Sequence, residues 1–193
     1  MNKVIIFSAP SGSGKTTLVR HALEHFPKLC FSVSCTTRQP RGEEKNGIDY
    51  HFISPEQFRS KIYADEFVEF EEVYEDKYYG TLKTEVQRIW DECKTVIFDV
   101  DVKGGIALKK YFGDQALSVF IMPPSIAELE RRLMLRGTDD VDTIKTRVAK
   151  AEEEMAFKNE FDRQILNTDL EHAKKEIEDI ISNFLQLNVK TPS

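Results

Sequence analysis

A glycine-bearing loop near the N-terminus constrains the fold of this chain more than any other feature. The loop, residues 9–16 with the sequence APSGSGKT, follows an apolar run at residues 4–7 and precedes a stretch with helical periodicity at residues 17–23. A strand, such a loop, a Lys-Thr pair and a helix, in this order, are the parts of a phosphate-binding P-loop. Glycines let backbone N–H groups approach a phosphate closely, and the helix N-terminus adds partial positive charge. The sequence therefore predicts a site for a nucleoside triphosphate.

The P-loop pattern predicts a role for individual side chains. Lys15 can reach the β- and γ-phosphates, and the hydroxyl of Thr16 can coordinate Mg²⁺. Ala9 stands where the pattern has glycine, and we expect its small methyl group to be tolerated. The alternative, a Gly/Ser turn that merely precedes a helix, is disfavoured because a strand and a helix flank the loop as the motif requires. The residues expected to contact the nucleotide are Pro10, Ser11, Gly12, Ser13, Gly14, Lys15, Thr16 and Thr17.

Composition narrows the classes of protein to which the chain can belong. It has 193 residues and a formal net charge of −6, which argues against a general binder of nucleic acids or membrane surfaces. Its three cysteines are odd in number and lack C-x-x-C spacing, which indicates free thiols in a reducing compartment. No run approaches the ~18 apolar residues of a membrane span, and the N-terminal apolar run is too short for a signal peptide. We expect a cytoplasmic protein with small-molecule partners.

Strand and helix signals alternate along most of the chain. The apolar runs at residues 95–99 and 117–121 are typical of strands buried on both faces, and residues 31–34 form a shorter predicted strand. This alternation predicts an α/β fold with three layers, a parallel core sheet and right-handed crossovers. Residues 34–94 break the rhythm, because their strands are short, mixed in polarity and close together. We interpret them as an inserted, partly antiparallel lobe, in which the sequence SPEQ at residues 54–57 caps a short helix.

Polar clusters outside the loop must supply any reaction, because a P-loop alone indicates only nucleotide binding. Arg38 and Arg41 can hold one phosphate through forked hydrogen bonds, although exposed arginines are also common as solvated charge. Asp99 ends a buried strand, and ligands of open α/β sheets bind at the carboxyl ends of strands. There it can act on Mg²⁺ directly or through water, or it can cap the next helix. The four histidines show no metal-ligand spacing, and we assign them no chemistry; they are His21, His25, His51 and His172.

Several motifs together resemble the guanylate kinase family. They are similar to the segments with which that family binds the GMP phosphate and the guanine base, to its buried acidic pair, to its lid and to its adenine-side motif. The GMP-phosphate segment lies at residues 31–41 and 46–50, and the guanine-base segment lies at 66–70 and 78–81. The acidic pair lies at 99–101, the lid at 132–138 and the adenine-side motif at 166–170. The matches follow the order of the family and cover nearly the whole chain.

The resemblance implies ligands, site residues and a division of the chain. The ligands are GMP as phosphoryl acceptor, ATP as donor and Mg²⁺. The GMP phosphate would be held by Arg38, Arg41, Tyr50 and Tyr79, the guanine by Ser34, Glu69 and Thr81, and the region between the nucleotides by Asp99 and Asp101. The implied catalytic residues are Lys15, Arg38, Asp99, Arg136 and Arg147. Of these, Arg136 and Arg147 would close from the lid over the transferring phosphoryl group, with Arg132 nearby, and Asn167 would lie near the adenine. The implied parts are a core at 1–33, 95–124 and 159–190, a GMP-binding lobe at 34–94 and a lid at 125–158.

The chemistry of guanine agrees with the position of Glu69. Guanine presents N1–H and an exocyclic N2 amine on one edge, and one carboxylate can accept from both, whereas adenine lacks these donors. Sites that depend on such hydrogen bonds can discriminate by roughly 10⁴–10⁵. Lys103 stands where the family often has glutamine, which leaves the ribose-side contacts of Asp101 open. Without the resemblance Glu69 would belong to a solvated acidic face, and we expect ordinary surface positions for Glu66, Glu71, Glu72, Glu75 and Asp76.

These observations predict an ATP-dependent guanylate kinase that converts ATP and GMP to ADP and GDP, and accepts dGMP, in the supply of purine nucleotides. The arginines of the lid would neutralise charge that spreads over the transferring group. Two alternatives remain: a phosphopeptide-binding scaffold module with this fold, and a kinase for another nucleoside monophosphate. Scaffold modules usually lack a working P-loop and the lid arginines, and Glu69 with Thr81 argues against another base. The oligomeric state is left open.

Overall fold

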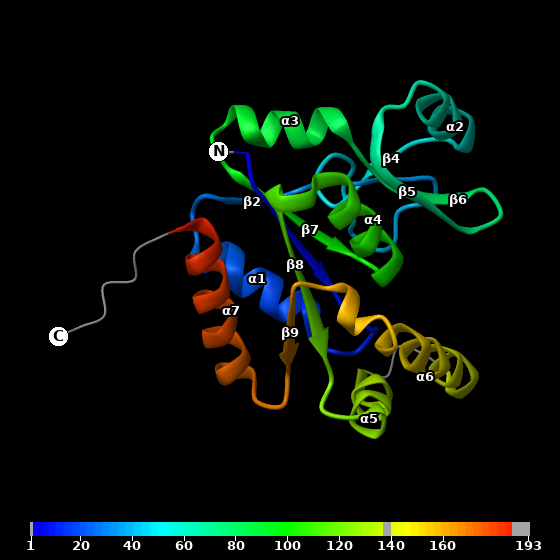
Figure 1. The fold of residues 1–193 in the computed structure, drawn as a ribbon. Helices are drawn as coiled ribbons and strands as arrows, with labels where there is room; N and C mark the ends of the chain where they lie inside the picture. Colours follow the sequence, from blue (N-terminus) through cyan, green and yellow to red (C-terminus); the bar gives the residue numbers. More distant parts are fainter. Residues whose placement is uncertain (1, 137–139, 187–193) are drawn as a thin grey trace.

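A parallel sheet forms the centre of the computed structural model, which describes residues 2–136 and 140–186 (Figure 1). Its five strands are β1 (Val4–Ser8), β2 (Leu29–Phe31), β7 (Thr95–Val100), β8 (Ala116–Met122) and β9 (Arg163–Leu166). They lie in the order β2-β7-β1-β8-β9, and each neighbouring pair is parallel. All residues of β1 are buried, so the strand that precedes the P-loop is fixed in the middle of the core. The predicted α/β fold is confirmed.

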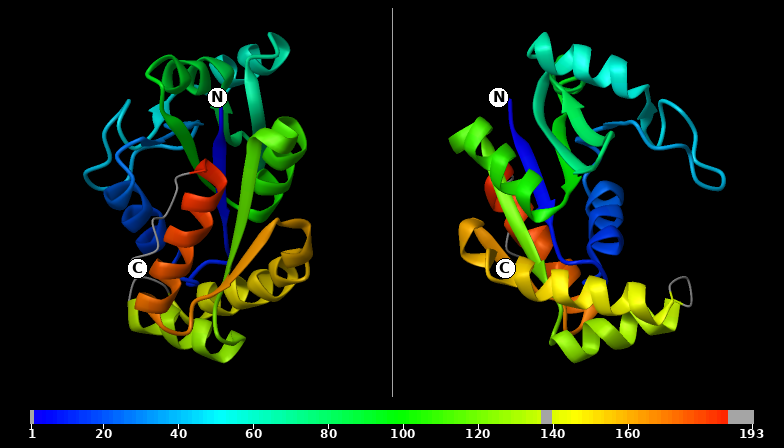
Figure 2. Two further views of the ribbon diagram at one scale, coloured as in Figure 1. Left: turned by 60° about the vertical axis from the view of Figure 1, so that its left-hand side comes forward. Right: turned by 90° about the vertical axis from the view of Figure 1, so that its right-hand side faces the viewer.

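Helices cover both faces of this sheet (Figures 1 and 2). On one face α1 (Lys15–His25) and α7 (Leu170–Leu185) pack against Ile5 and Phe7. On the other face α3 (Lys83–Asp91) and α4 (Val102–Phe112) pack against Val4 and Ile6. The side chains of β1 therefore alternate between two apolar layers, as the pleat of a strand dictates. Short 3₁₀ turns lie at Gly113–Gln115 and Lys158–Glu160.

A second, smaller sheet adjoins the core. Its strands are β3 (Cys35–Thr36), β4 (His51–Phe52), β5 (Phe67–Tyr74) and β6 (Lys77–Leu82), in the order β4-β3-β6-β5. β5 and β6 form an antiparallel hairpin, and β3 pairs in parallel with β4. The helix α2 (Pro55–Tyr63) begins at the predicted capping box, in which the Gln57 N–H donates to Ser54 Oγ and the Ser54 N–H donates to Gln57 Oε1.

Two further helices lie at the opposite end of the core from the second sheet (Figures 1 and 2). They are α5 (Ile126–Arg136) and α6 (Val141–Met155), and Asp140 caps α6 by accepting from the Thr143 N–H at 2.7 Å. Leu129, Leu133, Ile144 and Ala151 form a small apolar cluster between the two helices. No helix within residues 2–136 and 140–186 combines the length and the apolar character needed to cross a membrane.

The second strand of the core differs from its predicted bounds. The sequence predicts a strand over residues 31–34, but β2 ends at Phe31. The Ser32 N–H still donates to the Ile97 carbonyl, whereas the Val33 N–H donates to Glu85 Oε1 on α3. The Glu85 carboxylate thus accepts from the backbone N–H that would otherwise have continued the pairing of β2 with β7. Because Glu85 is 52 positions from Val33, the local sequence does not indicate this contact.

We expect Phe58→Ala to destabilise the protein strongly. Phe58 is fully buried, and its ring stacks on Phe67 and Tyr78 with centroid separations of 4.4 and 5.1 Å. Removing such a ring costs about 3–5 kcal/mol of unfolding free energy, measured by urea denaturation. Tyr63→Ala on the same helix is the control, because its side chain is 90% exposed, and we expect a change within about 0.5 kcal/mol. Equal losses in the two variants would contradict this packing.

Candidate active site

The loop between β1 and α1 has the backbone conformation that a P-loop requires. Gly12 and Gly14 have φ values of 93° and 90°, a region that L side chains rarely adopt. The Ser13 N–H donates to the Pro10 carbonyl at 3.2 Å and tightens the loop, and Gly14 is the N-cap of α1. Ala9, in the position where the pattern has glycine, is buried in the hydrophobic core. Packing therefore accommodates its methyl group.

Asn167 holds this loop at the end of β9. Its Nδ2 donates to the Ser13 carbonyl at 2.8 Å, and its N–H donates to the Met122 carbonyl of β8 at 2.9 Å. A Cβ on Gly14 would collide with the same Nδ2, so glycine is required there for this contact as well as for its positive φ. The family resemblance associates Asn167 with the adenine; the structure adds that its side chain supports the phosphate loop.

The loop contains a buried oxygen that suits a phosphate ligand. Within the described part of the chain, Ser13 Oγ is buried and has no hydrogen-bond partner. A buried polar group without a partner costs about 1–3 kcal/mol, and a phosphate oxygen bound in the loop would accept from this hydroxyl. Thr16 lines the same cavity together with Asp99. Hydroxyl and carboxylate oxygens are the ligands that Mg²⁺ prefers, so these residues fit the predicted metal. Thr17 is exposed on α1 and does not line the cavity.

Lys15 connects the P-loop to the neighbouring strand. Its Nζ lies 2.6 Å from Asp99 Oδ1 and donates to the Val100 carbonyl at 2.6 Å. The register of the sheet explains this contact, because Asp99 on β7 lies beside Phe7 on β1, where β1 enters the loop. The lysine and the aspartate thus meet at the carboxyl ends of adjacent parallel strands, where ligands of open α/β sheets bind.

Asp101 caps the helix that follows β7. Its Oδ1 accepts from the Gly104 N–H at 2.8 Å, and its carbonyl accepts from Ser8 Oγ at 3.0 Å. The capping role considered for Asp99 therefore belongs to Asp101, two residues later. Asp101 still lines the cavity, so its carboxylate joins α4 to the site.

Glu69 and Thr81 face each other across the β5–β6 hairpin. They are direct register partners, and Ser34 Oγ lies 3.0 Å from Thr81 Oγ1, within hydrogen-bonding distance. Burial raises the pKa of Glu69 to about 7, and the hydrogen bond from Thr81 opposes this shift in part. A ligand that donates two N–H groups to this carboxylate would favour its ionised form and hold it in place.

Glu71 differs from its predicted place on an ordinary surface. It lines the cavity, and burial, followed by the nearby Asp101, raises its pKa to about 7. Lys103 Nζ lies 3.7 Å from Glu71 Oε1, so the lysine that replaces the family's glutamine is paired with it. Residues 69 and 71 point to the same face of β5, as strand alternation requires, and this period-2 relation was a signal for Glu71 in the sequence.

Arg38 is held by a carboxylate and two aromatic rings. Its Nη1 and Nη2 donate to Glu44 at 2.6 and 2.8 Å, its Nε donates to Tyr79 Oη at 3.1 Å, and its guanidinium lies 4.9 Å from the centre of the Tyr50 ring. The forked bond from Arg38 lowers the pKa of Glu44 to about 2. Arg41 is exposed, and its N–H donates to the same carboxylate at 2.8 Å. Sequence reasoning missed Glu44, because acidic residues in polar loops are common.

The helix α6 contributes one face to the site. Arg147, Lys150 and Glu154 follow each other at helical spacing and line the cavity, and sequence reasoning had identified only the arginine. On α5, Arg132 donates to Glu128 Oε1 at 2.9 Å and to the Asn167 carbonyl at 3.2 Å. Arg136 ends α5, and its side chain lies outside the described part of the structure.

One cavity of about 540 Å³ joins these parts. It extends from the P-loop to the second sheet and to α6, so a site for phosphates and a site with hydrogen-bonding groups for a base share one space. The predicted residues that line it are Pro10, Ser11, Gly12, Ser13, Gly14, Lys15, Thr16, Ser34, Tyr50, Glu69, Tyr79, Asp99, Asp101 and Arg147. Four predicted residues lie behind this lining. Hydrogen bonds to lining residues are made by Arg38, Thr81 and Asn167, and the adjoining loop carries Arg41. The fold and the site together define a P-loop nucleotide-binding protein with a second binding region opposite the loop.

Comparisons with known proteins define the group more closely. The family profile of guanylate kinase matches residues 1–184, and the chain belongs to this family. The guanylate kinase of Porphyromonas gingivalis is 55% identical over 186 residues, which cover 96% of this chain and 99% of the relative. That of Bacteroides thetaiotaomicron is 54% identical, with 95% and 90% covered. The crystal structure of guanylate kinase from Anaplasma phagocytophilum superposes with a TM-score of 0.74 at 26% identity, covering 97% and 88%.

The raised pKa of Glu69 predicts a pH dependence of stability. Between pH 4.5 and pH 7 the folded protein retains this proton, whereas the unfolded chain has released it, so the free energy of unfolding falls as the pH rises. From pH 4.5 to pH 7 we expect the wild type to lose on the order of 1–3 kcal/mol relative to Glu69→Gln, measured by urea denaturation. Glu75→Gln, at an exposed position, is expected to follow the wild type. Parallel curves for the wild type and Glu69→Gln would contradict the burial of this carboxyl.

Proposed function

We propose that the protein transfers the γ-phosphoryl group of ATP to GMP, giving ADP and GDP. The observation that carries this proposal is the shared cavity, in which the P-loop and the half-buried carboxyl of Glu69 face one space. A nucleoside triphosphate in the loop and a nucleoside monophosphate beside Glu69 would direct their phosphates toward each other. Phosphoryl transfer needs this positioning and electrostatic stabilisation more than it needs covalent chemistry.

The acceptor side of the proposal rests on complementarity with GMP. Glu69 would accept from the N1–H and N2 amine of guanine, and the hydroxyls of Ser34 and Thr81, which lie 3.0 Å apart, would complete the polar edge of the base site. The 5′-phosphate would be held by Arg38, Arg41, Tyr50 and Tyr79. Arg38 is bound to Glu44, so the phosphate would compete with that carboxylate for the guanidinium. We propose dGMP as a further acceptor, because none of these groups addresses the 2′-hydroxyl.

The donor side rests on the P-loop. Its backbone N–H groups and Ser13 would hold the phosphates, Lys15 would exchange Asp99 for the β- and γ-phosphates, and Asn167 would lie on the adenine side. Thr16 and Asp99 would hold Mg²⁺, which neutralises charge on the phosphates of ATP.

Arginines of the helical lid would also neutralise negative charge on the transferring phosphoryl group. Arg147 lines the cavity from α6, and Arg136 is proposed to join it from the end of α5. Residues 125–158 would serve as this lid, residues 34–94 as the GMP-binding lobe, and the rest as the core. Closure of lobe and lid would exclude water from the phosphoryl group. A cytoplasmic location is proposed because Cys30, Cys35 and Cys93 are all free thiols.

A panel of acceptors tests the proposed reaction. In an assay that couples ADP release to a visible signal, we expect turnover with GMP and dGMP and little with AMP, CMP or UMP. Glu69→Gln should lose the preference for GMP over AMP by roughly 10²-fold or more, because its amide cannot accept from both guanine donors. Glu75→Gln, in the same hairpin but exposed, should keep the wild-type ratio. Binding of a phosphopeptide without turnover of any nucleotide would instead support a scaffold module.

Lys15→Ala tests the donor site. We expect kcat to fall by roughly 10²–10³-fold, because the variant loses a preorganised positive charge at the position where negative charge develops. GMP binding, measured by calorimetry without ATP, should change little. Lys28→Ala, which removes an exposed lysine beyond the end of α1, should keep the wild-type rate. A near-normal kcat for Lys15→Ala would remove this residue from the mechanism.

A further inference from the structure

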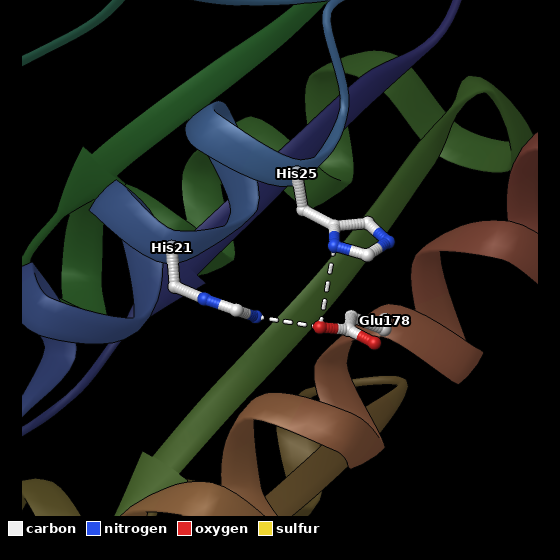
Figure 3. Close-up of side chains that lie close together, drawn as sticks. All are labelled: His21, His25 and Glu178. Atoms are coloured by element: carbon white, nitrogen blue, oxygen red, sulfur yellow. Dashed lines mark hydrogen bonds and ion pairs between the residues drawn. The ribbon is translucent and has the colours of Figure 1, made fainter.

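Two histidines and a glutamate meet on the face of the protein formed by α1 and α7 (Figure 3). His21 Nε2 lies 2.7 Å and His25 Nδ1 lies 3.4 Å from the same oxygen, Glu178 Oε1. His21 and Glu178 are half-buried, and His25 is exposed. No metal-ligand spacing marks these histidines in the sequence, because the carboxylate that completes the group is 157 positions from His21.

The packing of the two helices fixes the backbone positions of this cluster. On α1, Leu18 and Ala22 are fully buried, and on α7, Ile177 and Ile181 are fully buried in the same core cluster. The three polar residues lie at the rim of this apolar seam, within one helical turn of buried neighbours. Their Cα positions are therefore set by the core, and only side-chain rotations remain to bring their ligand atoms together.

We propose that His21, His25 and Glu178 form a binding site for a divalent transition metal ion, with Zn²⁺ as the best-suited ion. The three ligand atoms all lie within 4.8 Å of one another. Zinc bonds of about 2.0–2.2 Å in a tetrahedron place neighbouring ligand atoms about 3.3 Å apart. The His25–Glu178 separation of 3.4 Å is close to this spacing, and the hydrogen-bonded His21–Glu178 pair, at 2.7 Å, would open slightly by side-chain rotation to admit the ion. Two imidazoles and one carboxylate suit Zn²⁺ far better than Mg²⁺, which prefers oxygen ligands alone. The fourth position would be taken by water.

The placement on α1 adds an independent electrostatic contribution. His21 and His25 are one turn apart, and His25 is the last residue of α1. Unpaired carbonyl groups give the C-terminal end of a helix partial negative charge, which attracts a cation. A metal ion there would join α1, the helix that carries the P-loop, to α7 and stabilise the folded chain. This site is distinct from the proposed kinase site and does not depend on its function.

Zinc binding to the full-length, nucleotide-free protein tests the proposal. By isothermal titration with ZnCl₂ near neutral pH, we expect one equivalent to bind at this site. Thermal denaturation with zinc at about 100 times its Kd should show a midpoint raised by roughly 5–10 °C. In His25→Gln and Glu178→Gln the affinity should fall by more than about 100-fold, since even a group that only orients a ligand contributes about 10–100-fold.

Matched controls separate this site from other zinc ligands. His172→Gln, at an exposed histidine of α7, and Cys93→Ser, at the exposed thiol, should keep both the binding and the thermal shift. Circular dichroism without metal shows whether each variant is folded, and Co²⁺ absorption reports coordination in the wild type without reference to stability. Zinc binding that is unchanged in His25→Gln and Glu178→Gln, or absent from the wild type, would overturn the proposal and leave a His–Glu ion pair.

Discussion

The hydrogen bond from Asn167 to the Ser13 carbonyl is the contact on which the position of the phosphate loop depends. Asn167 also donates its N–H to Met122 on β8 and accepts at its carbonyl from Arg132 on α5. One residue that is 5% exposed thus joins the P-loop, the core sheet and α5. Since its amide occupies the space where a side chain on Gly14 would lie, loop and support constrain each other. The conformation of the phosphate loop is therefore fixed by the Asn167 side chain as well as by the loop's own glycines.

A site for two polyanionic nucleotides would be expected to be strongly basic, yet this one is not. Four cations in and around the cavity are paired with carboxylates within it or on the adjoining loop. The pairs are Lys15–Asp99, Arg38–Glu44, Lys103–Glu71 and Lys150–Glu154. Substrate phosphates would therefore exchange partners with these carboxylates and would not meet bare positive charge. Such pairing keeps the cations in place and is consistent with the net charge of −6 on the chain.

The features that the sequence predicted are those encoded locally. The P-loop, the alternation of strands and helices and the capping box at Ser54 and Gln57 each occupy a short window, and the fold they imply is confirmed. Contacts that depend on how a loop or a hairpin folds were not predictable in this way. Glu44 lies in an ordinary polar loop until Arg38 folds against it, and Glu71 is one of several consecutive acidic residues until the hairpin turns it toward Asp101. Motif resemblance supplied Glu69 together with Ser34 and Thr81, whereas only the period-2 relation to Glu69 points to Glu71.

The two ends of α1 carry opposite partial charges, positive at the N-terminal end and negative at the C-terminal end. The side chains at each end suit a ligand of the opposite charge. The N-terminal end carries the glycines and Lys15 for an anion, and the C-terminal end carries the two histidines beside Glu178. With 11 residues the helix is about 16 Å long, which exceeds the Debye length of about 8 Å at physiological salt. Direct repulsion or attraction between ligands at the two ends is therefore screened. A metal ion beside His25 would act on stability through the packing of α1 against α7 and would leave the charge balance around Lys15 unchanged.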